Sequence, residues 1–243
     1  MQLHIFKDLP ELSDHLAEWI TNYITKTIKI TGRFTWALSG GNTPKELYLL
    51  LGKSPYREKI DWEKLHIFWG DERDVPFDDP RNNAKMTFDT LLNHVPIPRQ
   101  QIHIMRTDIG AEKSAAAYQK LLHEYFPATG KSFDLNLLGM GEDGHTLSLF
   151  PGTPVIWESL AWTSAFYLPA QSMYRITLTK SIVNRSSCII FLASGSNKSL
   201  ALKEVLEGPF RPDQFPSQVI QPESGELHWF IDQPAAASLS NKN

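Results

Sequence analysis

Short apolar segments rich in β-branched and aromatic residues alternate with amphipathic segments along the whole chain of 243 residues. Several of these segments, such as 133–139 and 187–193, are almost continuously apolar, as strands covered by helices on both faces must be. Between them, apolar residues recur every three or four positions, as they do from Leu9 to Ile28. Alternating strands and helices favour parallel pairing with right-handed crossovers. The sequence therefore predicts an α/β fold: a doubly wound, mostly parallel sheet with helices on both faces.

Eight segments have the composition of strands. They are 2–6, 33–38, 64–69, 101–105, 133–139, 174–178, 187–193 and 227–231. A helix is predicted over 81–92, and the segment 151–173, with three prolines and Gly152, is predicted to be an irregular insertion or small subdomain. No repeat or linker divides the chain, so we predict one domain over residues 1–243.

The charge balance and the single cysteine exclude several classes of function. Lys and Arg number 24 against 27 Asp and Glu, and a net charge of −3 gives no overall basic field for nucleic acid. Cys188 alone forbids an internal disulfide or a four-cysteine zinc site and suits a reducing compartment. The first ten residues lack the apolar stretch of a signal peptide, and no run approaches the ~18 apolar residues of a membrane span. We expect a cytoplasmic globular protein.

Four groups of glycine and polar residues fall directly after predicted strands. These groups are 39–44 (SGGNTP), 70–73 (GDER), 139–145 (GMGEDGH) and 194–198 (SGSNK). The carboxyl ends of parallel strands lie along one edge of an open sheet, and ligands bind in the crevice there. Residues more than 150 positions apart are therefore predicted to meet in one pocket.

The first group has the pattern of a helix N-terminus that binds an anion. Thr43 followed by Glu46 is a capping-box pattern, and Pro44 suits the first helical position. The free N–H groups and the positive end of the helix dipole would then face the turn at Gly40 and Gly41, where a phosphate can approach the backbone closely. An ordinary tight turn between strand and helix is an equal alternative.

Cationic and amide side chains in and beside the other groups are candidates for substrate binding. Ser196 is predicted to cap a second helix with Lys198 in its first turn, where a lysine is unfavourable unless an anion compensates the dipole; a solvated lysine is the simpler alternative. Arg73 suits a phosphate or an oxyanion, although a surface salt bridge is the simpler alternative. Asn82 and Asn83 either bond substrate hydroxyls or cap the following helix.

The glycine-rich group after 133–139 matches the spacing of a dinucleotide fingerprint but not its context. Pro151 stops any helix within two turns, so a nicotinamide cofactor is not expected. The same loop places His145 beside Asp143 at the edge where ligands bind, and histidine is the usual general base near neutral pH. None of the eight histidines belongs to a metal-binding pattern such as HExxH. A hydrogen-bonded structural role is the plain alternative for His145.

Several strings spread over most of the chain resemble one known family. They are SGG-x-TP at 39–44, GDER at 70–73, G-x-G-x-DGHT-x-SLFP at 139–151, R-x-TLT at 175–179, G-x-x-K at 195–198 and P-x-x-G-x-x-x-W-x-x-D at 222–232. The chain is similar to the 6-phosphogluconolactonases, which belong to a broader group with glucosamine-6-phosphate deaminase and ribose-5-phosphate isomerase. Many members have Ser-Asn where this chain has Asn82 and Asn83, which puts the role of Asn82 in question.

The resemblance implies the NagB- and RpiA-like fold of that group and hydrolysis of 6-phospho-D-glucono-1,5-lactone in the oxidative pentose phosphate pathway. It implies no metal or organic cofactor, and a sugar-phosphate lactone as partner without nucleic acid, membrane or an obligate protein. The candidate catalytic residues are His145, Asp143 and Arg73. The candidate substrate-binding residues are Ser39, Gly40, Gly41, Asn83, Arg175 and Lys198.

Two other functions stay open on this fold. One is a glucosamine-6-phosphate deaminase or a sugar-phosphate isomerase. Deaminases of the group carry a DGHIAFNEP string whose glutamate assists ring opening, whereas this chain reads SLFP at 148–151. A non-catalytic sugar-phosphate sensor would need a DNA-reading module, and residues 1–30 offer only a strand and one long helix. The lactonase is therefore the preferred interpretation.

Overall fold

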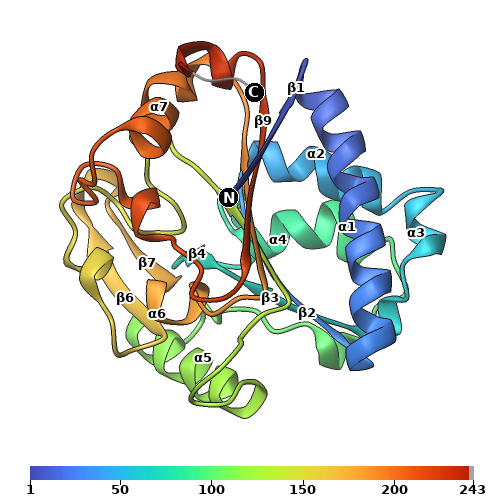
Figure 1. Cartoon of the computed structure of the whole chain (residues 1–243). Helices are drawn as coiled ribbons and strands as arrows, with labels where there is room; N and C mark the ends of the chain where they lie inside the picture. The colour runs from blue at the N-terminus through green and yellow to red at the C-terminus, as the bar shows by residue number, and fades with distance from the viewer. Residues whose placement is uncertain (241–243) are drawn as a thin grey trace.

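A computed structural model describes residues 1–240, and in them a six-stranded parallel sheet runs through the middle of the molecule (Figure 1). Its strand order is β1-β9-β8-β5-β2-β3, and every neighbouring pair is parallel. The strands are β1 (Gln2–Phe6), β2 (Phe34–Leu38), β3 (Leu65–Trp69), β5 (Leu135–Gly139), β8 (Cys188–Ala193) and β9 (Glu226–Asp232). The predicted parallel α/β sheet is confirmed.

Helices cover both faces of this sheet, as predicted, with a separate apolar core under each layer. One layer contains α1 (Leu9–Thr31), α2 (Asn42–Leu51), α3 (Tyr56–Lys59) and α4 (Asn83–Thr87). The other contains α5 (Ala111–Tyr125), α6 (Lys180–Val183) and α7 (Ser199–Glu207). Successive side chains of β2 point to opposite faces of the sheet and so contribute to both cores: Trp36 and Leu38 pack on the α1 side, and Ala37 packs on the α5 side.

The long helix α1 begins and ends where its sequence provides caps. The Asp8 side chain accepts a hydrogen bond from the backbone N–H of Glu11 at 3.1 Å. Gly32 takes a left-handed φ of 78° just past the end, and its N–H bonds the carbonyl of Ile28. The helix therefore ends at Thr31, three residues after Ile28, the last apolar position of the predicted periodicity.

A second, three-stranded antiparallel sheet stands apart from the main one, in the order β4-β7-β6. Its strands are β4 (Asp71–Arg73), β6 (Thr163–Leu168) and β7 (Met173–Leu178). The expectation that 174–178 joins the parallel alternation is therefore wrong, and 151–173 is not wholly irregular because it contains β6. Both β4 and β6 were missed, since β4 is only three residues long and β6 is defined by pairing with β7 rather than by its own pattern.

The predicted strand at 101–105 is absent. Residues 99–101 form a 3₁₀ turn, and only an isolated bridge joins Ile102 to Ile67 of β3. The Gln101 side chain donates to the carbonyls of Glu63 and Leu65, so a side chain occupies part of the edge that a further strand would pair with.

The helix predicted over 81–92 is shorter at its start and irregular at its end. It begins at Asn83, because the Asn82 side chain caps it by accepting from the N–H of Lys85 at 2.8 Å. After Thr87 it continues as a π-helical turn over Phe88–Leu92. The capping alternative for Asn82 is thereby confirmed, and Asn83 becomes the first residue of α4.

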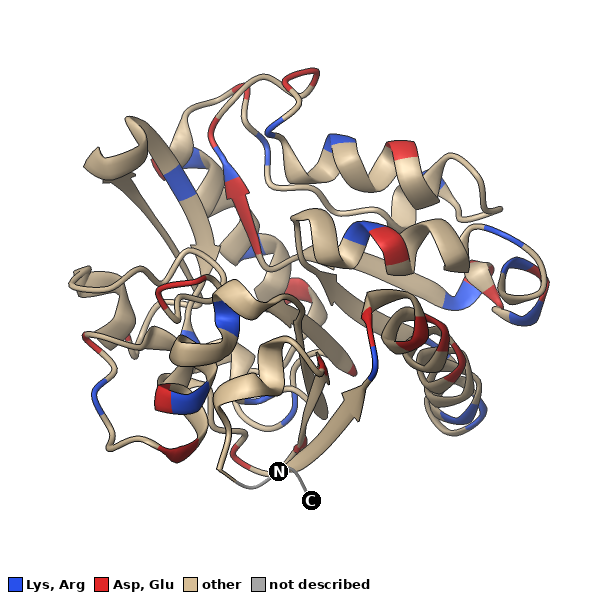
Figure 2. Ribbon diagram, turned by 90° about the horizontal axis from the view of Figure 1, so that it is seen from above, with Lys and Arg blue, Asp and Glu red and all other residues tan. Residues whose placement is uncertain are grey.

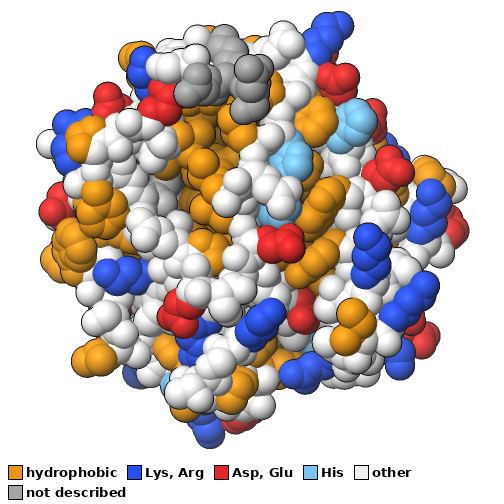
Figure 3. All heavy atoms as spheres, viewed as in Figure 1, with side chains coloured by type: hydrophobic (Ala, Val, Ile, Leu, Met, Phe, Trp, Pro, Cys, Tyr) orange, Lys and Arg blue, Asp and Glu red, His pale blue; other side chains and the backbone are white. Residues whose placement is uncertain are grey.

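The surface mixes charge signs and carries an apolar groove on one face. Lys and Arg are interspersed with Asp and Glu in the view of Figure 2, in line with the small net charge of −3. On the face shown in Figure 3, apolar side chains gather in a groove between α7 and β9, which is lined by Val205, Leu206, Ile220 and Leu227. None of the described helices is both long and apolar enough to cross a membrane.

Candidate active site

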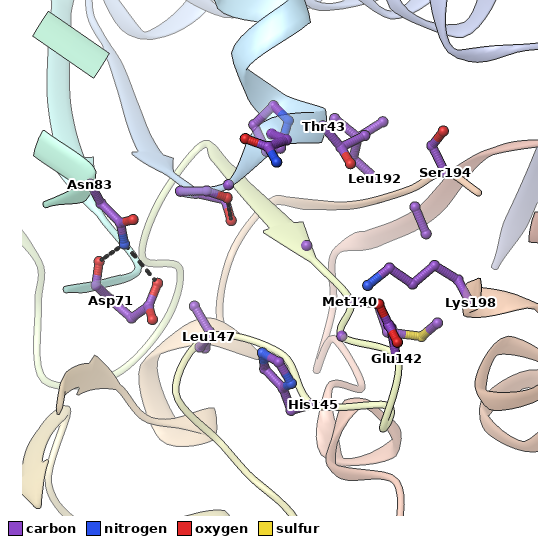
Figure 4. Close-up of a pocket in the computed structure, with 18 of the residues that line it drawn as sticks. Thr43, Asp71, Asn83, Met140, Glu142, His145, Leu147, Leu192, Ser194 and Lys198 are labelled. Atoms are coloured by element: carbon purple, nitrogen blue, oxygen red, sulfur yellow. Dashed lines mark hydrogen bonds between the residues drawn. The ribbon is translucent and has the colours of Figure 1, made fainter. Parts of the chain in front are cut away.

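A polar cavity of about 430 Å³ opens where the four glycine-containing groups come together. Eight of the nine predicted site residues line it, namely Ser39, Gly40, Gly41, Arg73, Asn83, His145, Arg175 and Lys198. The ninth, Asp143, bonds His145 from outside the lining. In Figure 4, Asp71 and Asn83 lie on one side of the cavity and Lys198 and Glu142 on the other, with His145 between them. The strand-end argument thus places the predicted residues of the four groups correctly, whatever their roles, whereas Asn83 and Arg175 lie outside those groups.

His145 is held in a defined tautomer by Asp143. Its Nδ1 lies 2.6 Å from Oδ1 of Asp143, which also accepts the backbone N–H of His145 at 3.1 Å. Burial raises the pKa of Asp143, but the hydrogen bonds and the charge of His145 outweigh it and lower that pKa overall. An ionised carboxylate only accepts hydrogen bonds, so Nδ1 carries the proton and Nε2 keeps its lone pair. Neutral His145 therefore has a free base at Nε2.

The ring of His145 is fixed by packing on two sides. It stacks on Phe150 with ring centroids 4.2 Å apart and an angle of 30° between the planes. Gly141 lies so close on the loop that a Cβ there would come within 2.1 Å of Nδ1 and 2.6 Å of Oδ1 of Asp143. A side chain at position 141 would therefore have to displace the Asp143–His145 pair from this arrangement.

Replacing Gly141 with Ala should displace the imidazole by about an ångström and lower kcat/KM on the substrate about 100-fold. Gly110→Ala is the control, because the residue lies outside the cavity lining; its φ of 86° strains an alanine, so this variant should lose thermal stability but keep its kcat/KM. Steady-state kinetics and thermal unfolding of both variants provide the measurement. Activity of Gly141→Ala within threefold of the parent protein would show that the loop relaxes and that glycine is not needed there.

The N-terminus of α2 reaches the cavity without a side-chain cap. The capping-box prediction is wrong: the helix starts at Asn42, and Gly41 occupies the cap position with a φ of 103°. Glycine adopts this positive φ readily but has no side chain to cap the helix, and among residues 1–240 no other side chain bonds the first N–H groups of α2. Gly40 packs against Asn83 so closely that a Cβ would lie 1.8 Å from its Oδ1. An uncapped helix N-terminus beside a glycine turn favours an anionic ligand.

Lys198 extends into the cavity from the loop after β8 (Figure 4). The prediction that Ser196 caps a helix here is wrong, because Gly195 with a φ of 100° precedes a 3₁₀ turn over Ser196–Lys198. The loop is held instead by Asp232 of β9, which accepts the N–H of Gly195 at 3.0 Å. Within residues 1–240, no carboxylate lies within ion-pair distance of Lys198, so its charge is available to a ligand.

Asp71 and Arg175 form a buried ion pair that the sequence did not reveal. Arg175 Nη2 lies 2.7 Å from Oδ2 of Asp71, and both side chains are less than a tenth exposed. Ser148 completes the network, donating to the same Oδ2 at 2.7 Å and accepting from Arg175 Nε at 2.8 Å. Burial raises the pKa of Asp71, but Arg175 and Arg73 together with the hydrogen bonds lower it overall. A third donor, Arg175 Nη1, binds Gln171, so most of this guanidinium is committed to the protein.

Arg73 lies beside this pair, opposite Arg175 in the β4–β7 ladder. Its Nη1 donates to the backbone carbonyl of Arg81 at 2.6 Å, which fixes the guanidinium at the cavity wall. Its Nε is buried and has no partner among the described residues. The surface salt bridge considered for Arg73 is therefore not formed within residues 1–240.

Glu72 is buried behind the site and orders it through the backbone. Its carboxylate accepts the N–H groups of Arg73 at 2.8 Å, Asn83 at 2.7 Å and Ala84 at 2.8 Å. It therefore ties the start of α4 to β4. Burial raises the pKa of Glu72 to about 7, although the three backbone N–H groups act in the opposite direction.

This raised pKa predicts a pH-dependent stability difference between the parent protein and Glu72→Gln. A raised pKa means that protonated Glu72 stabilises the folded state. This contribution is complete below pH 4.5, the ordinary pKa of a glutamate, and is lost as the pH rises through about 7. The unfolding free energy of the parent protein should therefore fall by about 3 kcal/mol relative to the variant between pH 4.5 and 8. Urea titrations of both proteins across this range give the difference. A constant gap would contradict the prediction.

A family model described as glucosamine-6-phosphate isomerases/6-phosphogluconolactonase matches residues 7–229. The chain belongs to this family. Within the family, a 6-phosphogluconolactonase from Synechocystis sp. is 41% identical over 224 residues, which is 90% of each protein. The solved 6-phosphogluconolactonase from Trypanosoma brucei is 27% identical and superposes with a TM-score of 0.86 over 98% of both chains.

A monomeric glucosamine-6-phosphate deaminase has the same fold, with a TM-score of 0.84 over 98% of this chain and all of that one, at 22% identity. This shared architecture confirms the fold expected for members of the glucosamine-6-phosphate isomerase/6-phosphogluconolactonase family.

Among residues 1–240, no three His, Cys, Asp or Glu side chains are arranged to hold a metal ion. Asp71, Glu72 and Ser148 are side chains in and beside the cavity to which the sequence analysis assigned no role. Only their positions in the sequence could have indicated a role, since Asp71 and Glu72 follow β3 and Ser148 lies in the DGHT-x-SLFP string.

Proposed function

We propose that this chain hydrolyses 6-phospho-D-glucono-1,5-lactone to 6-phosphogluconate, the step expected of a lactonase in the oxidative pentose phosphate pathway. One observation carries the proposal: an oriented Asp143–His145 pair shares its cavity with an uncapped helix N-terminus and an unpaired lysine. The substrate has the two features that match these groups, an ester carbonyl and a phosphate dianion. The 6-phosphogluconolactonase names of relatives up to 41% identical support the same activity.

His145 acts as the general base in this proposal. Its Nε2 removes a proton from water as the water oxygen attacks C1 of the lactone, and the carbonyl becomes a tetrahedral oxyanion. The intermediate then collapses, the bond from C1 to the ring oxygen breaks, and the imidazolium returns the proton to that oxygen. Asp143 keeps the ring oriented and stabilises its charged form. General-base assistance of this kind is worth about 10²–10⁴-fold in rate.

The phosphate is assigned to the side of the cavity formed by Lys198 and the N-terminus of α2. Lys198 has no carboxylate partner within residues 1–240, and the first N–H groups of α2 have no side-chain cap. A phosphate dianion there would be attracted by the ammonium of Lys198 and by the positive end of the α2 dipole. Glu142 lines the same side, but its carboxylate accepts a hydrogen bond from the Asn197 amide, whereas the carboxylate of Asp71 lies on the opposite side. Ser39, Gly40 and Gly41 then line the phosphate end of the substrate.

The oxyanion is assigned to Arg73. Its guanidinium stands at the cavity wall on the Asp71 side, held by the carbonyl of Arg81. A fixed donor aimed at developing charge contributes about 3–4 kcal/mol to transition-state stabilisation. Arg175 is mostly bonded to Asp71, Ser148 and Gln171, so we assign it a positioning role rather than direct substrate binding.

A coupled assay tests the activity. Glucose-6-phosphate dehydrogenase generates fresh lactone, and its disappearance is followed with and without this protein, because the lactone also hydrolyses spontaneously. Acceleration above the spontaneous rate supports the proposal. Release of ammonia from glucosamine 6-phosphate, without lactone hydrolysis, would instead assign the chain to the deaminases of the family.

We also propose a cytoplasmic location. The single cysteine, Cys188, is a buried free thiol, which suits a reducing compartment. Labelling of cell fractions with an antibody against the chain tests this placement, and recovery in an oxidising compartment would contradict it.

A further inference from the structure

Asp71 presents an acceptor to the cavity that the proposed mechanism does not use. Its Oδ2 is filled, because Ser148 Oγ and Arg175 Nη2 each donate to it at 2.7 Å. The only contact of its Oδ1 within residues 1–240 is the amide of Asn83 at 3.5 Å, the outer limit of a hydrogen bond. That amide already donates to the backbone carbonyl of Asp71 at 2.9 Å. One oxygen of the carboxylate is therefore poorly satisfied by the protein.

The pairing with Arg175 determines what this free oxygen can bind. With the guanidinium and Ser148 on one oxygen, Asp71 stays ionised, and an ionised carboxylate accepts hydrogen bonds but donates none. The phosphate, the carbonyl and the ring oxygen of a phosphosugar lactone are all acceptors and would be repelled or unmatched. Among the groups of that substrate, only the ring hydroxyls are donors.

The position of Asp71 fits this chemistry. It lines the cavity on the side away from Lys198, where the phosphate is assigned, and His145 lies between the two sides (Figure 4). A ring that extends from a phosphate at Lys198 toward His145 therefore presents its hydroxyl-bearing carbons to the side of Asp71 and Asn83. The side chain is nearly buried, so a hydrogen bond there is shielded from water.

We infer that Asp71 is a substrate-binding, specificity-determining residue whose Oδ1 accepts a hydrogen bond from one ring hydroxyl of the lactone. This inference rests on the proposed lactonase function. A site built to bond a hydroxyl discriminates strongly against the analogue that lacks it, because a buried polar group is then left unpaired. The cavity therefore selects polyhydroxylated lactones over simple lactones of similar size.

The test compares 6-phospho-D-glucono-1,5-lactone with its 2-deoxy, 3-deoxy and 4-deoxy counterparts. In the parent protein, one of the three should lose about 10- to 100-fold in kcat/KM, the range for a hydrogen bond to a charged group. Asp71→Asn should lose a similar factor on the intact lactone, and its penalty for that same deoxy-lactone should shrink several-fold. Ser148→Ala is the matched control, since it removes a partner of Oδ2 and leaves Oδ1 in place. It should keep the full deoxy penalty.

The outcomes separate this inference from the proposed function. A parent protein that does not hydrolyse the intact lactone refutes the function itself. A parent protein that hydrolyses it but shows no deoxy penalty, or an Asp71→Asn variant with an unchanged penalty, overturns only the inference. An equal loss of kcat/KM by Asp71→Asn on all four lactones would indicate that Asp71 acts on the attacking water, and this would also overturn the inference. If Asp71→Asn does not fold, the double variant with Arg175→Met, which removes both buried charges, takes its place.

Discussion

Replacing His145 with Gln should lower kcat for lactone hydrolysis by about 10²–10⁴-fold while leaving substrate affinity within a few-fold of the parent protein. Glutamine has no group that accepts a proton near neutral pH, so the attacking water keeps its proton as the C–O bond forms. The phosphate contacts assigned to Lys198 and α2 are not touched by the change. Initial rates with fresh lactone, corrected for spontaneous hydrolysis, give kcat and KM.

His94→Gln is the matched control for this prediction. His94 is an exposed histidine outside the cavity lining whose Nε2 contacts the carbonyl of Asp89. It should retain the kcat of the parent protein. The general-base assignment fails if His145→Gln keeps a kcat within threefold of the parent, or if the loss appears in KM alone.

Replacing Arg175 with Met should destabilise the fold by about 3–5 kcal/mol at neutral pH, the cost of leaving one partner of a buried pair uncompensated. Asp71 is 5% exposed, so its carboxylate would lie in a protein interior without the guanidinium that is bonded to it, with only the charge of Arg73 still acting on it. The hydrogen bond to Ser148 remains but does not replace the guanidinium. Chemical denaturation of both proteins at equal ionic strength measures the difference.

The deficit of Arg175→Met should depend on pH in a defined direction. Arg175 and Arg73 hold the pKa of Asp71 below its ordinary value of 3.8 against the effect of burial, so loss of Arg175 raises it. A folded-state pKa above that of the unfolded chain means that stability is recovered as the pH falls and Asp71 is protonated. The deficit is therefore largest near pH 7 and shrinks toward acid pH.

Two further variants separate the lost charge pair from the lost arginine. Arg185→Met removes a guanidinium of similar burial that donates to the neutral carbonyls of Pro127 and Gly130, and it should cost less. In Arg175→Met with Asp71→Asn, stability should recover relative to Arg175→Met alone, because no buried charge is left unpaired. An Arg175→Met deficit that equals that of Arg185→Met and does not change with pH would contradict the ion-pair account.

The positions of the site loops could be predicted because they depend on local patterns. Apolar runs such as 133–139 and 187–193 identify parallel strands, and the order of elements places their carboxyl ends at one edge. Whatever glycine and polar residues follow those strands must then meet. His145 was found in this way without any knowledge of its contacts.

The helix starts were predicted in the right places but for the wrong reason. Thr43 and Ser196 have the residue types of caps, yet Gly41 and Gly195 take the cap positions with φ near 100°. A side-chain cap was expected because the capping pattern is a statistical preference of isolated segments. In the folded chain the turn at Gly41 approaches the cavity and leaves the first N–H groups of α2 without a side-chain cap, whereas the N–H of Gly195 is bonded to Asp232.

The amino-acid sequence by itself indicated the parallel α/β sheet, the glycine turns at its edge and the Asp143–His145 pair, because each is signalled by patterns of residues close together in the chain. Only the tertiary structure decided that Asp71 and Arg175, 104 residues apart, neutralise each other. That pairing follows from the short antiparallel ladder of β4 and β7. The strand β4 is too brief to be recognised alone, and the strand predicted at 174–178 was not expected to pair with it. Burial then makes the pairing energetically decisive, and burial is a property of the assembled chain rather than of any segment.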